Sequence, residues 1–147
     1  MKPGESFLYN RTGITPAVAA AVEAVDRERV AVAAAYGIRA VSLCQWLSDT
    51  YGVKGDSLYE MLQNNAAYAN IKSISSLQNR FLTEDTPSGL VPLEAFGQLA
   101  GVATPVMTSV INLANELLGQ DFRVVGRNLK CLGLEGLSVS EIKEKYV

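Results

Sequence analysis

Apolar residues recur along most of this chain at the three- and four-residue spacing of an α-helix. The first such segment starts at Thr15, a good N-cap, and Pro16, whose missing N–H costs nothing in a first helical turn. The pattern continues to about Tyr36, and Gly37 can adopt the left-handed conformation that ends a helix. The positions expected to face other helices are Val18, Val22, Val25, Val32 and Tyr36. The many alanines between them predict a central helix that its neighbours approach closely.

Later segments repeat this helical pattern. A second helix is predicted from about Val41 to Tyr51, and a third begins at Ser57, which forms a capping box with Glu60. Further helices are predicted over residues 92–100, over residues 105–118 behind a second Thr-Pro pair, and from Ser138, where Glu141 completes another capping box. The inward positions of the later helices are Leu93, Phe96, Leu99, Ala100, Val106, Val110, Ile111, Leu113, Leu117 and Leu118.

No stretch shows the alternating pattern of a convincing strand. The fold class is therefore predicted to be all-α, with about seven helices. The chain has 147 residues, of which 48% are hydrophobic, and this length and composition favour a single compact domain over residues 1–147.

Charge and composition exclude several classes of function. The chain has 13 basic and 15 acidic residues and no run of like charge, which argues against binding to nucleic acid or to an anionic membrane surface. No apolar run is long enough to cross a bilayer, and the N-terminus lacks the apolar core of a signal peptide. We therefore expect a cytoplasmic protein.

Two cysteines and the absence of histidine limit the chemistry further. Cys44 and Cys131 are too few for a disulfide scaffold and lack the paired spacing of a zinc site, so buried free thiols are predicted. The chain contains no histidine and no Gly-rich phosphate loop. Any catalytic site must therefore be completed by residues from elsewhere.

The segment from Arg80 to Pro92 is charged and bounded by prolines, and it is predicted to be an irregular loop between helices. Charges in such a loop suggest a site, although Arg80 could equally form an ordinary surface ion pair with Glu84 or Asp85. Elsewhere, Trp46, Tyr51 and Tyr68 could border a pocket, but aromatic residues at helical spacing are more often core. Asn64, Asn65 and Tyr68 could also bind a carboxylate, which the sequence leaves open.

The residues Arg80-Phe81-Leu82-Thr83-Glu84-Asp85-Thr86-Pro87 resemble the Arg-x-x-Thr-Glu-Asp-x-Pro segment in the all-helical C-terminal domain of the opine (octopine/nopaline) dehydrogenase family. Residues 13–16 and 23–33 resemble that domain's opening helix. Its later helices are matched, in order, by residues 90–93, 99–105, 119–123, 126–129 and 132–134. The resemblance implies a helical domain of the kind found in opine and 6-phosphogluconate-type dehydrogenases.

Opine dehydrogenases, as the resemblance implies, condense an α-keto acid with an amino acid and reduce the imine with NADH or NADPH. Carried over by position, Asp85 is the catalytic partner of a histidine that precedes the helical domain, and Arg80 reaches toward the cofactor pyrophosphate. The implied partners are an upstream dinucleotide-binding domain, an amino acid and an α-keto acid, with a homodimer left open. No metal is implied.

The missing histidine and nucleotide loop depart from the family pattern. We therefore expect this chain to be the isolated C-terminal domain, without catalytic activity of its own. Met1 is expected to be a start supplied to a truncated chain. One alternative is a non-catalytic all-α interaction or dimerisation module, and another is a related two-domain dehydrogenase for a hydroxy acid or sugar phosphate. The sequence fixes neither the substrates nor the choice between NAD and NADP.

Overall fold

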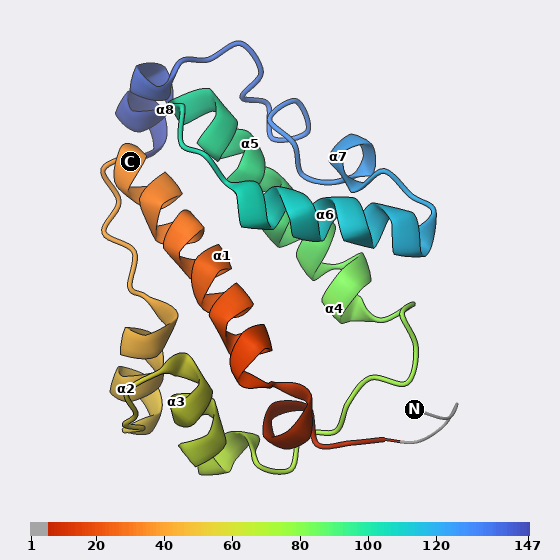
Figure 1. Cartoon of the computed structure of the whole chain (residues 1–147). Helices are drawn as coiled ribbons and strands as arrows, with labels where there is room; N and C mark the ends of the chain where they lie inside the picture. Colours follow the sequence, from red (N-terminus) through yellow and green to blue (C-terminus); the bar gives the residue numbers. More distant parts are fainter. Residues whose placement is uncertain (1–5) are drawn as a thin grey trace. The chain divides into compact units, whose positions relative to one another are not determined.

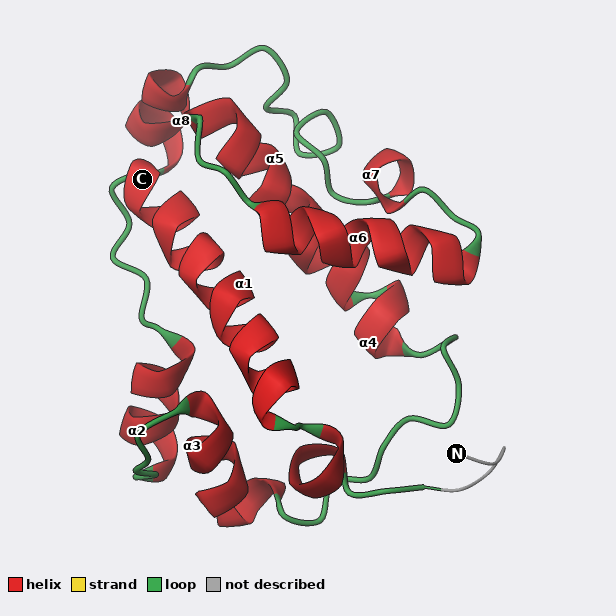
Figure 2. Ribbon diagram, in the orientation of Figure 1, coloured by secondary structure: helices red, strands yellow, loops and turns green. Residues whose placement is uncertain are grey.

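The computed structural model describes residues 6–147, and the regular structure of this part of the chain is helical (Figures 1 and 2). Leu8 and Lys72 form an isolated antiparallel bridge, and no strand occurs within residues 6–147. The all-α fold class is confirmed. Within the same residues, no helix is both long enough and apolar enough to cross a membrane. The prediction about Met1 lies outside the described residues.

The helices are joined by connections of different lengths, the longest of which are residues 69–79 and residues 126–138. Those of the described residues are η1 (Tyr9–Gly13), α1 (Pro16–Ala35), α2 (Leu43–Tyr51), α3 (Leu58–Asn64), η2 (Ala66–Tyr68), α4 (Arg80–Thr83), η3 (Thr86–Leu90), α5 (Val91–Ala100), α6 (Pro105–Leu118), α7 (Phe122–Val125) and α8 (Val139–Tyr146). They form two compact units. The first contains Met1–Arg27 and Val41–Ser76, and the second contains Glu28–Ala40 and Leu77–Val147, so α1 contributes residues to both.

The ends of α1 are set by the predicted residues. Thr15 Oγ1 accepts a hydrogen bond from the Val18 N–H at 3.2 Å, and Gly37 has a φ of 81° just beyond the helix. Ala19 and Val32 are buried as expected of a central helix. The predicted inward position of Val18 was wrong, because its neighbour Ala19 faces the core in that turn and Val18 is exposed.

Acidic side chains of α1 cap the N-termini of other helices. In the first unit, Glu23 accepts the Leu58 N–H of α3 and Asp26 accepts the Leu43 N–H of α2, each at 2.8 Å. In the second unit, the two oxygens of Glu28 accept the N–H groups of Val106 and Met107 of α6, also at 2.8 Å. Each carboxylate satisfies backbone donors that have no partner within their own helix, and its charge favours the positive end of the helix dipole.

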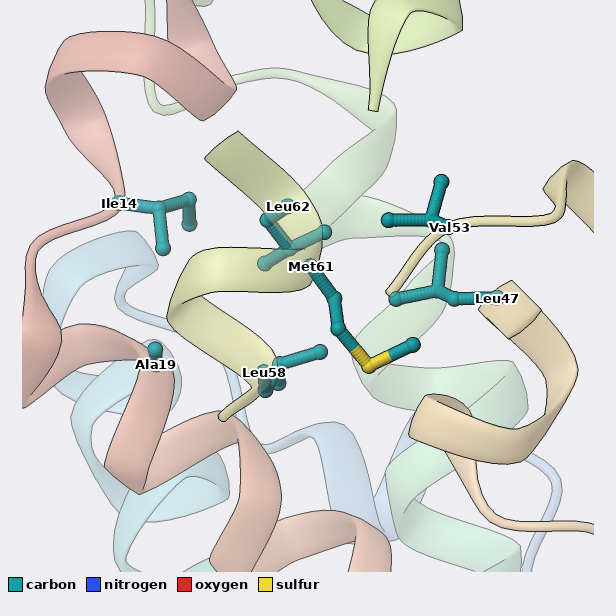
Figure 3. Packing of buried hydrophobic residues seen from close by; sticks show 7 residues of the cluster. All are labelled: Ile14, Ala19, Leu47, Val53, Leu58, Met61 and Leu62. Carbon is teal, nitrogen blue, oxygen red and sulfur yellow. The ribbon is translucent and has the colours of Figure 1, made fainter. Parts of the chain in front are cut away.

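The core of the first unit forms where α2 and α3 pack with the start of α1. Met61 extends from α3 toward Leu47 of α2 (Figure 3), within a buried cluster of Ile14, Ala19, Leu47, Val53, Leu58, Met61 and Leu62. The predicted cap of α3 is half confirmed. Ser57 accepts the Glu60 N–H at 3.2 Å, but the Glu60 carboxylate accepts the N–H of Asp56, not that of Ser57.

The core of the second unit lies among α5, α6, α8 and the end of α1. Tyr36 packs edge-on against Phe96, with ring centroids 5.4 Å apart, and its hydroxyl donates to the Phe96 carbonyl at 3.0 Å. The inward face of α6 consists of Met107, Ile111 and Ala114. Leu118 packs against this core as predicted, but the predicted inward positions of Val110, Leu113 and Leu117 were wrong, because this second apolar stripe is exposed.

Candidate functional site

The segment that carries the charged motif is helical, so the prediction of an irregular loop was wrong. Asn79 caps helix α4, because its Oδ1 accepts the Phe81 N–H at 3.2 Å, and η3 continues directly into α5. Pro87 and Pro92 both lie in first-turn positions, of η3 and α5 respectively. A proline is tolerated there because a first-turn N–H has no intrahelical partner.

Asp85 occupies the N-cap position of η3 and is exposed. Its backbone is in the right-handed helical region, with φ −70° and ψ −33°, and its side chain makes no capping hydrogen bond. The next two residues, Thr86 and Pro87, are buried. The carboxylate is therefore presented to solvent by a backbone that is fixed immediately beside it.

Arg80 lies five residues before Asp85 and is also exposed. Its Nε is 3.4 Å from Glu84 Oε2, and the two side chains retain 73% and 58% of their exposure. The surface ion pair considered from the sequence therefore exists, and its acid is Glu84. A pair this exposed is worth only about 0.2–1 kcal/mol. The guanidinium is accordingly available to a stronger anionic partner.

A buried carboxylate nearby was missed by the sequence analysis. Glu94 of α5 is only 2% exposed and accepts two hydrogen bonds from Arg123, at 2.5 and 2.7 Å, and one from Thr108 at 2.6 Å. The hydrogen bonds from Arg123 are the main reason that the pKa of Glu94 is lowered, and they raise the pKa of Arg123. A signal was present in the sequence, since Glu94 shares its helical face with the buried Val91 and Gly97.

The aromatic residues of the first unit form a cluster at its surface. The ring of Tyr51 meets those of Trp46 and Tyr68 edge-on, with centroids 5.5 and 5.3 Å away. Trp46 and Tyr51 are exposed, so the preference for a core position was wrong for both. Burial, followed by the 3.4 Å hydrogen bond to the Tyr51 hydroxyl, raises the pKa of Tyr68 to about 12.

Two asparagines lie beside this cluster. Asn64 and Asn65 line a cavity of about 330 Å³ together with Tyr51 and Lys54. Asn65 is 1% exposed, and its Oδ1 accepts the Ala67 N–H at 3.0 Å while its Nδ2 has no partner among the described residues.

Both cysteines are free thiols, in agreement with the sequence analysis. Cys44 is half-buried, and burial is the main cause that raises its pKa, with smaller effects from Glu23 and Asp26. Cys131 is exposed, so its predicted burial was wrong: it lies in a turn, where its N–H donates to Asn128 Oδ1 at 2.9 Å. Within residues 6–147, no three potential metal-ligating side chains come together.

Comparison with known proteins places these residues in a family. Residues 2–118 match the family described as NAD/NADP octopine/nopaline dehydrogenase, alpha-helical domain. The chain is 40% identical over 140 residues to an opine dehydrogenase of Arthrobacter sp. (strain 1C), covering 95% of this chain and 39% of that protein. It is 30% identical over 121 residues to the protein ocs of Agrobacterium tumefaciens (strain Ach5), covering 82% and 34%.

Solved structures show the same likeness. Octopine dehydrogenase in complex with NADH and agmatine superposes with a TM-score of 0.74 and 26% identity, over 99% of this chain and 43% of that one. The complex with NADH and L-arginine gives a TM-score of 0.72 and 25% identity over the same shares. This chain thus spans about two fifths of the length of these proteins. It belongs to the octopine/nopaline dehydrogenase family and corresponds to the alpha-helical domain of that family.

Proposed function

We propose that this chain is the substrate-binding and catalytic helical domain of an opine-type dehydrogenase, which reductively condenses an α-keto acid with an amino acid using NADH or NADPH. The observation that carries the proposal is the exposed Asp85 carboxylate, at the aspartate position of the family motif and without a capping hydrogen bond. Because the family match extends through both compact units, we treat them as one functional domain.

Asp85 is proposed to act on a histidine that this chain does not contain. Its carboxylate would accept the imidazole N–H, fix the tautomer and orientation of the ring, and raise the histidine pKa by favouring the charged form. The histidine could then hold and transfer a proton at the substrate near neutral pH. An exposed carboxylate suits this task because a second domain can reach it.

Arg80 is proposed to bind the pyrophosphate of the cofactor. A guanidinium can donate two charge-assisted hydrogen bonds to phosphate oxygens, and these are stronger than its exposed pairing with Glu84. The cofactor supplies the hydride when bound. Its remaining contacts are assigned to a dinucleotide-binding domain outside these residues, because no Gly-x-Gly-x-x-Gly turn is present in the sequence. That domain would also decide between NAD and NADP.

Substrate class follows from the same likeness. The octopine dehydrogenases that this chain resembles were solved with NADH and either L-arginine or agmatine. We propose an amino acid and an α-keto acid as the two small-molecule substrates, and the cytoplasm, where reduced nicotinamide cofactors and free thiols coexist, as the location of the reaction.

A hybrid protein tests this function directly. The chain replaces the segment that it matches in the Arthrobacter opine dehydrogenase, and oxidation of NADH or NADPH is measured with pyruvate and a panel of amino acids. Turnover that requires both substrates is expected. A folded hybrid that binds the cofactor but turns over with none of the amino acids would contradict the proposal. The isolated chain, which lacks the histidine, serves as the inactive control.

A non-catalytic interaction or dimerisation module is the second candidate. It is favoured by the exposed apolar stripe on α6, formed by Val110, Leu113 and Leu117. If the stripe pairs with a second copy, sedimentation of the isolated chain should show a dimer that Leu113→Glu converts to a monomer. A chain that stays monomeric at high concentration counts against this candidate.

A further inference from the structure

The turn after α7 approaches the Asp85 segment more closely than any side chain would allow. The N–H of Arg127 donates to the Pro87 carbonyl at 2.9 Å. A Cβ atom on the buried Gly126 would lie 2.7 Å from the Pro87 carbonyl oxygen and 3.0 Å from its Cα. Gly126 has an ordinary φ of −84°, so glycine is required here for the close backbone approach, not for its conformational freedom.

Helix α7 is itself held firmly in the second unit. The Arg123 guanidinium donates two hydrogen bonds to the buried Glu94 carboxylate and a third to Asn112 Oδ1 at 2.8 Å. The Phe122 N–H donates to Asn115 Oδ1 at 3.0 Å, and the Phe122 ring is buried. Because Glu94 is almost fully buried, its ion pair cannot rearrange without leaving a charge unpaired. The helix that precedes Gly126 is therefore held in place by these contacts.

The contact reaches Asp85 through Pro87, which is buried. Pro87 follows Asp85 by two residues in the same helical turn, and the Asp85 side chain makes no capping bond. An added methyl group at Gly126 would also meet the Phe122 carbonyl oxygen at 2.5 Å, within a helix that the Glu94–Arg123 pair restrains. Relief of the strain would have to displace Pro87 as well as the turn after α7, because the added atom meets both, and Asp85 would move with Pro87.

We infer that Gly126 is a positioning residue, which determines the position of the Asp85 carboxylate. The Glu94–Arg123 pair contributes by restraining the helix that precedes Gly126. This inference rests on the proposed role of Asp85, since Gly126 would affect the reaction only through the position of that carboxylate. Acid–base partners are sensitive to such placement: a misplacement of about 1 Å can cost about 10²-fold in rate. Gly126 itself touches no reacting atom and is not a catalytic residue.

The position of the segment can be tested in the chain alone, without any activity. Gly126→Ala should shift the backbone amide ¹H–¹⁵N signals of Asp85, Thr86, Ser88 and Gly89, since Pro87 has no N–H. The matched control is Gly97→Ala in α5, where the three nearest atoms to a Cβ would be Thr104 Cγ2 and the Val102 carbonyl oxygen at 3.0 Å and Val32 Cγ2 at 3.2 Å, none of them in η3. The control should leave the Asp85 signal in place. An unmoved Asp85 signal in folded Gly126→Ala overturns the inference.

Arg123→Lys provides a second, milder variant should Gly126→Ala not fold. Lysine keeps the charge beside Glu94 but loses the planar fork, so α7 is held less rigidly. The Asp85 signals should shift in the same direction and by a smaller amount. Identical Asp85 signals in Arg123→Lys and the parent chain would likewise overturn the inference.

A double-mutant cycle in the hybrid enzyme tests the effect on catalysis. Gly126→Ala should lower kcat by about 10- to 100-fold, with KM for the keto acid changed by less than about twofold. In the Asp85→Asn background it should cause no further loss, because it acts only through that carboxylate. Equal losses in both backgrounds would show a general structural effect and contradict the inference. If Asp85→Asn alone leaves kcat unchanged, the proposed function fails. The amide spectra would still show whether Gly126 determines the position of the Asp85 segment.

Discussion

Asp85 and Glu94 are carboxylates in consecutive helical segments of the same unit, yet their surroundings are opposite. Glu94 is 2% exposed and accepts three hydrogen bonds, two from Arg123 and one from Thr108. Asp85 is exposed and makes no capping bond. The fold supplies hydrogen-bond partners for the Glu94 carboxylate, whereas it leaves the Asp85 carboxylate exposed to solvent.

This difference separates a structural acid from a candidate catalytic one. A carboxylate removed from water must be paired, and Glu94 is held by partners from α6 and α7. Asp85 has no such need, and its exposure is compatible with the partner proposed for it above. Changes at Glu94 should therefore affect folding, and changes at Asp85 should affect only chemistry.

The largest expected change in stability follows loss of Glu94. Glu94→Ala should lower the free energy of unfolding by about 3 kcal/mol, near the lower end for breaking a buried ion pair, because the Arg123 side chain is already 32% exposed. Urea unfolding of the isolated chain measures this. The matched control is Glu84→Gln, which breaks an exposed pair with Arg80 and should cost less than about 1 kcal/mol. Equal losses would erase the distinction between the two kinds of acid.

Acid should weaken the same contact. The pKa of Glu94 is lowered below its ordinary value of 4.5, chiefly by the hydrogen bonds from Arg123, so the unfolded chain binds a proton more readily than the folded one. The stabilisation is therefore complete above pH 4.5 and is lost as the pH falls through the folded-state pKa. Urea unfolding at a series of pH values should show the difference between the parent chain and Glu94→Gln narrowing in acid. A constant difference down to pH 3 would contradict the assignment.

The cap on α6 should have a smaller effect. Glu28→Gln removes a charge that accepts two backbone N–H groups, and we expect a loss of about 0.5–2 kcal/mol, the range for helix N-caps. Thermal and urea unfolding provide the measurement. Glu116→Gln, an exposed change on α6 itself, is the control and should have almost no effect. A Glu28→Gln variant as stable as the parent would show that the negative charge contributes little and that an amide oxygen accepts these N–H groups as well.

The smallest change in stability is expected for Asp85. Asp85→Asn removes an exposed charge that makes no capping bond, so the free energy of unfolding should stay within about 0.5 kcal/mol. The same urea titrations measure it alongside Glu94→Ala. A loss as large as that of Glu94→Ala would mean that Asp85 has a structural role.

Local residues explain why much of the fold could be predicted from the sequence. The capping box of Ser138 and Glu141 and the left-handed glycines Gly101 and Gly119 act within one helical turn, and all occur as predicted. The two Thr-Pro starts show the limit of such reasoning. Thr15 caps its own helix, but Thr104 makes no capping bond, because Glu28, far away in the sequence, binds the start of α6 instead.

The site could be predicted only as far as its local motif extends. The motif locates Arg80 and Asp85, and the structure shows both side chains exposed. The pairing of Glu94 with Arg123 and the approach of Gly126 to Pro87 are long-range contacts, which no local spacing encodes. The exposure of the second apolar stripe of α6 and of the Trp46 side chain could not be predicted either. Helical periodicity shows where an apolar stripe lies on a helix, but it does not show whether another element covers that stripe.

The most direct test is kcat of the hybrid dehydrogenase with and without Asp85→Asn, measured on protein whose unfolding is unchanged. If this carboxylate orients and charges a histidine, the substitution should lower kcat by about 10²- to 10⁴-fold, the range for acid–base partners. A kcat within about twofold of the parent would remove Asp85 from the mechanism and, with it, the catalytic assignment of this domain.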